Sequence, residues 1–304
     1  MCSLVVLVPL PGFEAGALLA SRLEAALLRV SEKAFPDGEL YVRIEDYDKL
    51  SGEDVVVAST LYPEQLEKLF KTLILINAAK SNGAKRVVAY VAYLAYARQD
   101  KVFLPGEPVS ACVVSKALRT SGADALVVVD AHSPRALECF EGPVANVAVS
   151  HVLVGAALKY LEDPVVIAPD KGALERAEYA AKHYGLDYDY LIKQRDRVTG
   201  EVSYVPREVS VKNRDVVIVD DIISTGGTIA EASRVLLRSG ARRIAVAASH
   251  GLLVGEALRK LESSGVAKVV LGNTLMTRHE HPLVEYVDVT PVVAEELKRL
   301  LKPS

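Results

Sequence analysis

The segment from Val216 to Ala230, VVIVDDIISTGGTIA, constrains the fold of this chain more than any other. It begins with four aliphatic residues, which is typical of a strand buried on both faces of a parallel sheet. Two acids, Asp220 and Asp221, follow at once, and a Thr- and Gly-rich turn then leads into a helical pattern. Thr228 and Glu231 have the spacing of a capping box, so we expect Thr228 to be the N-cap of that helix.

This strand, turn and helix together predict a phosphate site beside two carboxylates. Open α/β sheets bind ligands at the carboxyl ends of their strands. Glycines let backbone N–H groups point inward, and the helix N-terminus adds positive potential. Carboxylates do not hold phosphate, but they accept hydrogen bonds from sugar hydroxyls or bind a metal. A phosphorylated sugar therefore fits better than the alternative, a tight connection whose acids only cap. The candidate residues are Asp220, Asp221, Ser224, Thr225, Gly226, Gly227 and Thr228.

Short apolar runs alternate with helical patterns along the rest of the chain, which favours an α/β fold with parallel sheets. Residues 125–132, ALVVVDAH, and 216–223, VVIVDDII, are each a buried strand that ends in an acid. We therefore expect two α/β domains, residues 1–146 and 147–304. The expected strands are 4–8, 40–44, 54–59, 86–92, 125–129, 165–168, 189–192, 216–219, 243–248 and 268–271, and the expected helices are 16–28, 63–83, 109–121, 149–161, 174–183, 229–239 and 291–301.

Composition and the missing motifs exclude several classes of protein. The net charge of -3 gives no basic footprint for nucleic acid, and no apolar run approaches the length of a membrane span. The sequence contains neither a G-x-x-x-x-G-K-[ST] loop nor a G-x-G-x-x-G fingerprint, which argues against a P-loop ATPase and a dinucleotide dehydrogenase. The three cysteines, Cys2, Cys112 and Cys139, are scattered and odd in number. We expect them to be reduced thiols in a cytoplasmic protein.

The central segment resembles the phosphoribosyl-diphosphate binding motif of phosphoribosyltransferases and of ribose-phosphate diphosphokinases. Further motifs, in the right order from about Phe35 to the C-terminus, narrow the resemblance to the ribose-phosphate diphosphokinase family. They are FPDGE at 35–39, YARQDK at 96–101, EPVSA at 107–111, VVDAH at 128–132 and APDKG at 168–172. The resemblance implies two phosphoribosyltransferase-like domains, each with a mainly parallel sheet flanked by helices.

The resemblance also implies a reaction that belongs to nucleotide biosynthesis. The diphosphoryl group of ATP passes to O1 of ribose 5-phosphate with Mg2+, giving 5-phosphoribosyl 1-diphosphate and AMP. The N-terminal domain would contribute the ATP site, completed by a neighbouring subunit of a homo-oligomer, and the C-terminal domain the ribose 5-phosphate cradle. The residues implied, besides those of the cradle, are Phe35, Asp37, Glu39, Arg98 and Gln99 for ATP, His132 and Asp170 for the metal, and Lys193 and Arg195 for catalysis.

Several of these residues also have a purely structural interpretation. Lys193 and Arg195 lie two apart, so both can face one ligand and neutralise charge on the β-phosphate and leaving AMP. The segment from Lys193 to Glu201 could instead be a solvated hairpin. His132 could bond backbone at a strand end, Asp170 could be a helix N-cap, and Phe35 could be a buried aromatic. Arg98 and Gln99 could be surface residues of a loop.

Two other functions stay open at this point. A phosphoribosyltransferase would use the same cradle but would not need the FPDGE and YARQDK segments of an ATP site. A non-catalytic regulatory paralogue would assemble with active subunits. The presence of Lys193, Arg195, His132 and both cradle acids argues against that paralogue.

Overall fold

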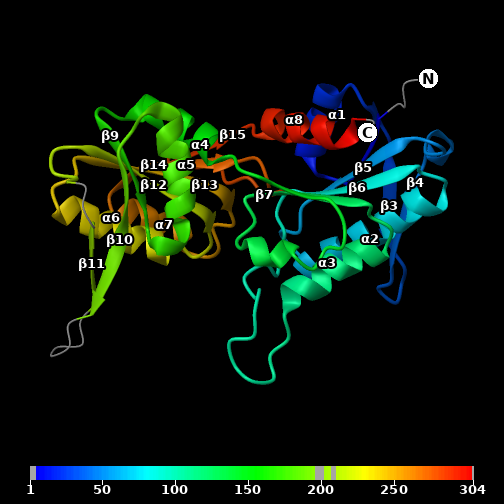
Figure 1. Cartoon of the computed structure of the whole chain (residues 1–304), viewed down its shortest axis with the longest axis horizontal. Coiled ribbons are helices and arrows are strands. Elements are labelled where there is room, and N and C mark those ends of the chain that lie inside the picture. Colours follow the sequence, from blue (N-terminus) through cyan, green and yellow to red (C-terminus); the bar gives the residue numbers. More distant parts are fainter. Residues whose placement is uncertain (1–4, 196–201, 207–209, 303–304) are drawn as a thin grey trace. The chain divides into compact units, whose positions relative to one another are not determined.

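The computed structural model describes residues 5–195, 202–206 and 210–302, with the backbone alone for 193–195 and 202–206. The chain divides into two compact units (Figure 1). The first comprises Met1–Val147, Thr274–Thr277 and Asp288–Ser304, and the second comprises Ala148–Asn273 and Arg278–Val287.

The first unit is built around a six-stranded parallel sheet in the order β2-β1-β5-β6-β7-β8. Figure 1 shows α1 and α8 together on one face of this sheet and α2 and α3 on the other. A separate antiparallel hairpin is formed by β3 and β4. The elements are β1 (Val5–Pro9), α1 (Glu14–Leu23), β2 (Ala26–Leu27), β3 (Val30–Ala34), β4 (Leu40–Ile44), η1 (Tyr47–Lys49), β5 (Asp54–Ser59), α2 (Gln65–Ser81), β6 (Arg86–Val91), α3 (Ser110–Thr120), β7 (Ala125–Val129), η2 (Pro134–Leu137), β8 (Val144–Val147) and α8 (Thr290–Leu301).

The second unit has a seven-stranded sheet in the order β11-β10-β9-β12-β13-β14-β15. All neighbours are parallel except β11, which pairs with β10 in the antiparallel direction. The elements are α4 (Ser150–Ala157), η3 (Leu158–Tyr160), β9 (Pro164–Ala168), η4 (Lys171–Ala173), α5 (Leu174–Tyr184), β10 (Tyr188–Arg195), β11 (Val202–Pro206), β12 (Asp215–Ile223), α6 (Gly227–Arg238), β13 (Arg243–Gly251), α7 (Ala257–Ser263), β14 (Val266–Gly272) and β15 (Val284–Val287).

The strand cores follow from the sequence pattern. β5, β7 and the first five residues of β12 are buried throughout, as expected for parallel strands covered on both faces by helices. In the β3–β4 hairpin, by contrast, Leu40, Val42 and Ile44 are less exposed than the residues between them. The predicted α/β class with mainly parallel sheets is therefore confirmed.

Some element boundaries differ from the expected ones. The helix expected over 16–28 ends at Leu23, because Glu24 takes the left-handed conformation with φ 53° and its N–H bonds back to the helix. The chain then forms β2, which is too short to give a periodic signal. The final helix, α8, belongs to the first unit, whereas the sequence prediction grouped residues 147–304 together. The assignment of the ATP site and the cradle to two domains stays a prediction.

The prediction of reduced cysteines is wrong for two of the three. Cys112 of α3 and Cys139 form a disulfide, with their Cα atoms 5.0 Å apart. They meet because α3 packs on η2, where the buried Ser115 Oγ donates to Ala136 O at 2.8 Å. A separation of 27 residues carries no disulfide signature, so the spacing alone could not indicate this pair. Of the helices in the described part of the chain, none is both long and apolar enough to span a membrane.

Candidate functional site

The two acids of the central segment lie inside β12, at a point where one neighbouring strand has ended. β12 pairs with β13 as far as Ile223, but its pairing with β9 stops at Ile218. Asp220 and Asp221 therefore follow the last β9 pairing, at the carboxyl edge of the sheet where α/β proteins bind ligands. Asp221 is buried, and Asp220 is half-buried.

Electrostatics distinguish Asp220 from an ordinary surface acid. Burial, followed by the negative charge of Asp221, raises the pKa of Asp220 well above its usual range. Two smaller effects oppose this rise: the Asp221 N–H donates to Asp220 Oδ1 at 2.9 Å, and the guanidinium of Arg176 lies nearby. The acid pair is thus a cluster of carboxyl oxygens at the sheet edge, in which Asp220 keeps its proton to higher pH than an ordinary aspartate. It suits ligands that donate hydrogen bonds.

The turn after β12 leads directly into the N-terminus of α6. The prediction that Thr228 is the N-cap is wrong, because the N-cap is Gly226, with φ 73°, and the helix begins at Gly227. A Cβ on Gly226 would lie 3.1 Å from the carbonyl oxygen of Ala257, so both the backbone angle and the close approach favour glycine there. Glu231, the other half of the expected capping box, instead pairs with arginines on the outer face of α6.

The turn between β12 and α6 is hydrogen-bonded to the protein on one side and exposed on the other. Its inner side is tied to the segment after β13, since Leu253 N donates to Ile223 O at 3.1 Å and Val254 N donates to Ser224 O at 2.9 Å. Thr225, Gly227 and Thr228 are exposed. The first amides of a helix have no carbonyl acceptor within that helix. At α6 these amides belong to an open turn, which makes the turn suitable for phosphate.

Lys193 and Arg195 lie on β10, whose neighbour β9 adjoins β12 in the same sheet. In the antiparallel pairing with β11, Lys193 is opposite Tyr204 and Arg195 is opposite Val202. The two residues are thus two apart on the backbone of β10. The remainder of the expected catalytic segment, residues 196–201, lies outside the described residues.

The proposed adenine turn connects β3 and β4 and is exposed. Phe35 N donates to Glu39 O, and Gly38 N donates to Phe35 O, both at 2.8 Å. Asp37 Oδ1 accepts from Glu39 N at 3.2 Å. The Phe35 side chain is 41% exposed, so its interpretation as a buried aromatic is wrong. Its ring meets Tyr41 edge-on, with centroids 6.0 Å apart.

Gln99 and Arg98 differ in what they contact. Gln99 fixes the start of α3, because its Oε1 accepts from Ser110 Oγ and its carbonyl oxygen accepts from Ala111 N at 3.2 Å. Arg98 is exposed. Gln99 therefore has a structural role that the sequence did not indicate, whereas Arg98 stays a candidate for phosphate binding.

The two predicted metal ligands belong to different units. His132 follows β7 and is exposed, and the buried Asp130 two positions earlier has a left-handed backbone with φ 37°. Asp170 follows β9 and caps η4, where its Oδ1 accepts from Gly172 N at 2.7 Å and Ala173 N at 3.3 Å. Its interpretation as an N-cap is thus correct. Across residues 5–192 and 210–302, the structure shows no cluster of three side chains suited to hold a metal.

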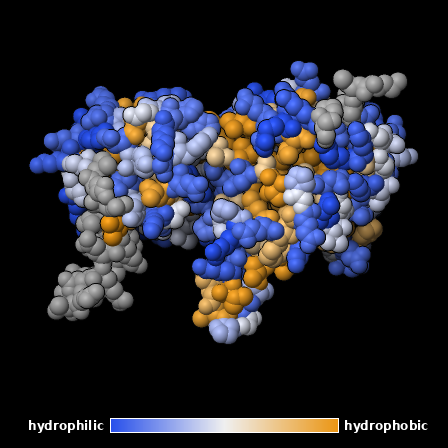
Figure 2. Space-filling view, viewed as in Figure 1, coloured by the Kyte–Doolittle hydropathy of each residue, from blue (hydrophilic) through white to orange (hydrophobic). Residues whose placement is uncertain are grey.

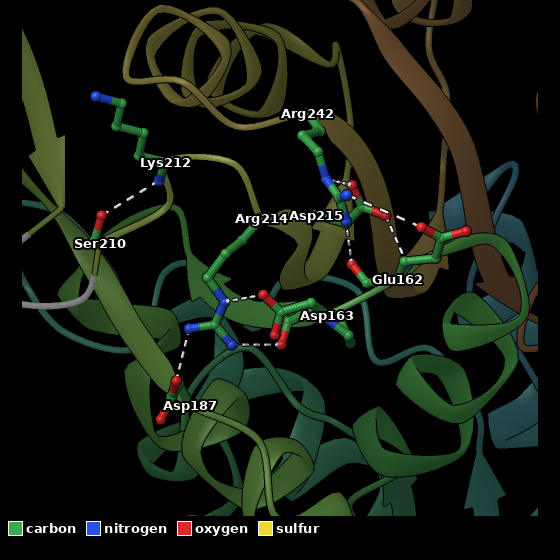
Figure 3. Close-up of polar contacts among 9 residues, drawn as sticks. Glu162, Asp163, Asp187, Ser210, Lys212, Arg214, Asp215 and Arg242 are labelled. Atoms are coloured by element: carbon green, nitrogen blue, oxygen red, sulfur yellow. Dashed lines mark hydrogen bonds and ion pairs between the residues drawn. The ribbon is translucent and has the colours of Figure 1, made fainter.

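The opposite edge of the second sheet is held together by ion pairs (Figure 3). Asp215, the buried first residue of β12, accepts from Glu162 N at 2.7 Å and pairs with Arg242 Nε at 3.3 Å. Arg214 pairs with Asp163 and with Asp187 at 3.3 and 2.6 Å. These charges satisfy one another at the amino ends of the strands. They stabilise that edge, whereas the acids at the carboxyl edge lie beside an open turn.

The sequence reasoning did not identify Arg176. This residue lies in the first turn of α5, and its Nη1 is 4.0 Å from Asp221 Oδ1. Its side chain is mostly buried. Forty-five positions separate the two residues, 221 less 176, so only the tertiary structure brings them together.

The chain matches two family models and is similar to several relatives of known name. Residues 14–122 match the N-terminal domain of ribose phosphate pyrophosphokinase, and residues 148–274 match the phosphoribosyl transferase domain. It is 42% identical over 304 residues to a ribose-phosphate pyrophosphokinase from Methanopyrus kandleri, covering 98% of this chain and 99% of the relative. It is 41% identical over 286 residues to one from Aeropyrum pernix, covering 93% and 92%.

A crystal structure of phosphoribosylpyrophosphate synthetase from Mycobacterium smegmatis is similar over almost the whole chain. The two align with a TM-score of 0.88 and 31% sequence identity, covering 98% of this chain and 99% of the other. The similarity therefore extends over both units and is not limited to the cradle.

Proposed function

The chain belongs to the ribose-phosphate pyrophosphokinase family and has that family's activity, and we propose that its own residues carry the reaction at a cradle in the second unit and a nucleotide site in the first. The match of residues 14–122 argues against the phosphoribosyltransferase alternative, which shares only the cradle motif. The protein is accordingly a transferase of nucleotide biosynthesis.

Ribose 5-phosphate would bind at the end of β12. The observation that carries this assignment is the acid pair beside the exposed N-terminus of α6. The amides and hydroxyls from Ser224 to Thr228 would hold the phosphate, while Asp220 and Asp221 would accept hydrogen bonds from the ribose hydroxyls. The phosphate end of the ligand requires hydrogen-bond donors, which the turn would supply. The ribose hydroxyls require acceptors, which the two aspartates would supply.

ATP would bind in the first unit, near the exposed turn from Phe35 to Glu39 and near Arg98. An exposed ring such as Phe35 offers a stacking surface for adenine, and a guanidinium pairs well with phosphate oxygens. Asp37 and Glu39 would accept from the adenine amino group or the ribose. Gln99 would act by holding the start of α3, as its contacts with Ser110 and Ala111 indicate.

Lys193 and Arg195 would act on the transferring group. O1 of ribose 5-phosphate attacks the β-phosphorus of ATP, and the bond to the α-phosphate oxygen breaks, so AMP leaves. Positioning and charge neutralisation do most of the work in such transfers. Two cations spaced two residues apart on β10 would neutralise charge that builds on the β-phosphate and its bridging oxygen.

Magnesium is the expected cofactor, with His132 and Asp170 as its predicted ligands. Mg2+ prefers oxygen ligands and often binds through one or two carboxylates together with substrate phosphates. Asp170 fits this role, since it caps η4 through Oδ1 while Oδ2 makes no hydrogen bond within the described residues. His132, at the end of β7, would contribute directly or through water. A bound Mg2+ would neutralise charge on the phosphate oxygens.

We also propose a homo-oligomer, because the first unit exposes many large apolar side chains. Phe35, Leu66, Phe70 and Tyr96 are 39 to 71% exposed, and the last three line a cavity of about 720 Å³ with Gly38 of the adenine turn. Figure 2 shows further apolar surface on the projecting segment between β6 and α3, where Phe103 is 57% exposed. Apolar patches of this kind mark interaction sites. A cytoplasmic location stays a prediction.

The decisive experiment is an incubation of the purified protein with magnesium chloride, ATP and ribose 5-phosphate. We expect AMP, formed only when ribose 5-phosphate is present. ADP in its place would indicate a plain kinase, and no turnover would favour the non-catalytic paralogue. Light scattering after size exclusion tests the oligomer, since a fully active monomer would contradict a shared adenine site.

A further inference from the structure

Arg176 is a largely buried arginine beside the cradle acids. It lies in the first turn of α5, directly after η4, and so at the same carboxyl edge of the sheet as the cradle. Its carbonyl oxygen accepts from Ser150 Oγ at 3.2 Å, which ties this turn to α4. Only 15% of its side chain is exposed. A buried guanidinium requires charged or polar partners, so its position is informative.

The guanidinium of Arg176 points to Asp221. Nη1 lies 4.0 Å from Asp221 Oδ1, and the Asp221 side chain is only 6% exposed. Charges that are shielded from water on both sides attract each other more strongly than charges on the surface. The same guanidinium also opposes the rise in the pKa of Asp220. Arg176 therefore acts on both cradle acids, although the sequence places it 45 positions before Asp221.

Two adjacent carboxylates are a difficulty for a ligand that carries a phosphate. Their charge suits the ribose hydroxyls but repels the phosphate that must bind a few residues away, at the N-terminus of α6. A fixed cation behind the pair reduces this repulsion and keeps the carboxylates oriented. We propose that Arg176 is a positioning residue for ribose 5-phosphate, which holds Asp221 in place and offsets the charge of the acid pair. This inference rests on the proposed binding of ribose 5-phosphate at the cradle.

The same strand supplies a matched control. Asp215 is the buried first residue of β12 and pairs with Arg242 Nε at 3.3 Å (Figure 3). Both pairs, Arg176–Asp221 and Arg242–Asp215, join an arginine to a buried aspartate of β12. The second pair lies at the other end of the strand, six residues away, which is roughly 20 Å at the usual rise. Loss of this pair should reduce stability without reaching the sugar site.

The test compares Arg176→Gln, Arg176→Lys and Arg242→Gln with the unchanged enzyme. For Arg176→Gln we expect the KM for ribose 5-phosphate to rise about ten- to a hundredfold, as when a residue that orients a ligand-binding side chain is lost. The KM for ATP should stay the same, and kcat should change little. Arg176→Lys keeps the charge and should recover part of the loss. Arg242→Gln should lower Tm and leave both KM values unchanged.

A titration calorimetry measurement with ribose 5-phosphate and magnesium chloride, without ATP, separates binding from turnover. A double variant, Arg176→Gln with Asp221→Asn, should bind hardly worse than Asp221→Asn alone, because the two residues act as one unit. If Arg176→Gln does not fold, the inference is tested with Arg176→Lys and its calorimetric titration with ribose 5-phosphate.

Three results would overturn the inference: unchanged ribose 5-phosphate binding in the Arg176 variants, equal rises in both KM values, or the same rise in Arg242→Gln. Failure of the unchanged protein to bind ribose 5-phosphate would instead refute the proposed function.

Discussion

One arginine contributes to the attachment of the C-terminal helix to the first unit, and its contribution can be measured. Arg86, at the start of β6, makes a two-pronged pair with the buried Asp54, through Nε at 3.1 Å and Nη2 at 3.0 Å. Its Nη1 and Nη2 also donate to the carbonyl oxygens of Leu300 and Leu301, both at 2.9 Å. The last carbonyls of a helix have no partner within it, so Arg86 both bonds the end of α8 and complements its dipole.

We predict that Arg86→Met destabilises the protein by about 2 to 3 kcal/mol. Removal of one partner of a buried ion pair typically costs 3 to 5 kcal/mol. The Arg86 side chain is 30% exposed, so solvent screening reduces this value. The first unit contains 168 residues, 147 plus 4 plus 17, and 1 kcal/mol in this size range shifts Tm by roughly 2 to 4 °C. A fall in Tm of roughly 5 to 10 °C should result.

The assay is thermal unfolding followed by circular dichroism, with hydrogen exchange to locate the effect in α8. Arg299→Met is the matched control, because Arg299 lies on the same helix and pairs with Glu296 while 71% of its side chain is exposed. An exposed pair of this kind contributes little to stability, because water and salt screen it. Equal melting temperatures for Arg86→Met and Arg299→Met would refute the reasoning. The double variant Arg86→Met with Asp54→Leu should recover part of the loss, since it leaves no unpaired buried charge.

Three further predictions concern the reaction, the acid pair and the disulfide. Lys193→Ala and Arg195→Ala should each lower kcat about a hundred- to a thousandfold, with KM and Tm nearly unchanged, in steady-state kinetics and thermal unfolding. Burial raises the pKa of Asp220, so the folded protein keeps this proton to higher pH than the unfolded chain. The free energy of unfolding should then fall as pH rises from the usual aspartate range to the raised pKa. Urea titrations without metal measure this fall, and Asp220→Asn should remove it. Reduction of the Cys112–Cys139 bond, which closes 27 residues, should cost about 3.5 kcal/mol, measured as a lower Tm with dithiothreitol.

Each of these predictions has an outcome that contradicts it. Near-normal kcat in both Lys193→Ala and Arg195→Ala would mean that charge on the β-phosphate is neutralised elsewhere, with Arg98 the next candidate. A pH profile of stability that is the same with and without the Asp220 carboxyl would show that the pKa of Asp220 is not raised in the folded protein. If Cys112 and Cys139 are paired, only Cys2 should react with a thiol reagent in the absence of reductant. A count of three reactive thiols per chain under those conditions would show that they are not paired.

The sequence by itself determined the fold class and predicted the chemistry of the cradle. Both depend on local patterns: aliphatic runs predict buried parallel strands, and the acid pair followed by a Thr- and Gly-rich turn predicts a sugar phosphate site at a strand end. β5 and β7 have the predicted limits, 54–59 and 125–129, because their burial is uniform along their length. The motif order was sufficient to indicate the family, as the relatives then confirmed.

Only the tertiary structure decided the contacts between distant residues. The position of the N-cap at Gly226, one residue before α6, is linked to the close approach of Ala257. The Cys112–Cys139 bond depends on how α3 packs on η2, and α8 is held by its packing on α1 and by Arg86. Arg176 reaches Asp221 because β9 ends early and α5 starts beside the opening. Backbone patterns repeat every two or 3.6 residues and can be read locally, whereas a charge acts on whatever the fold brings within a few ångströms of it.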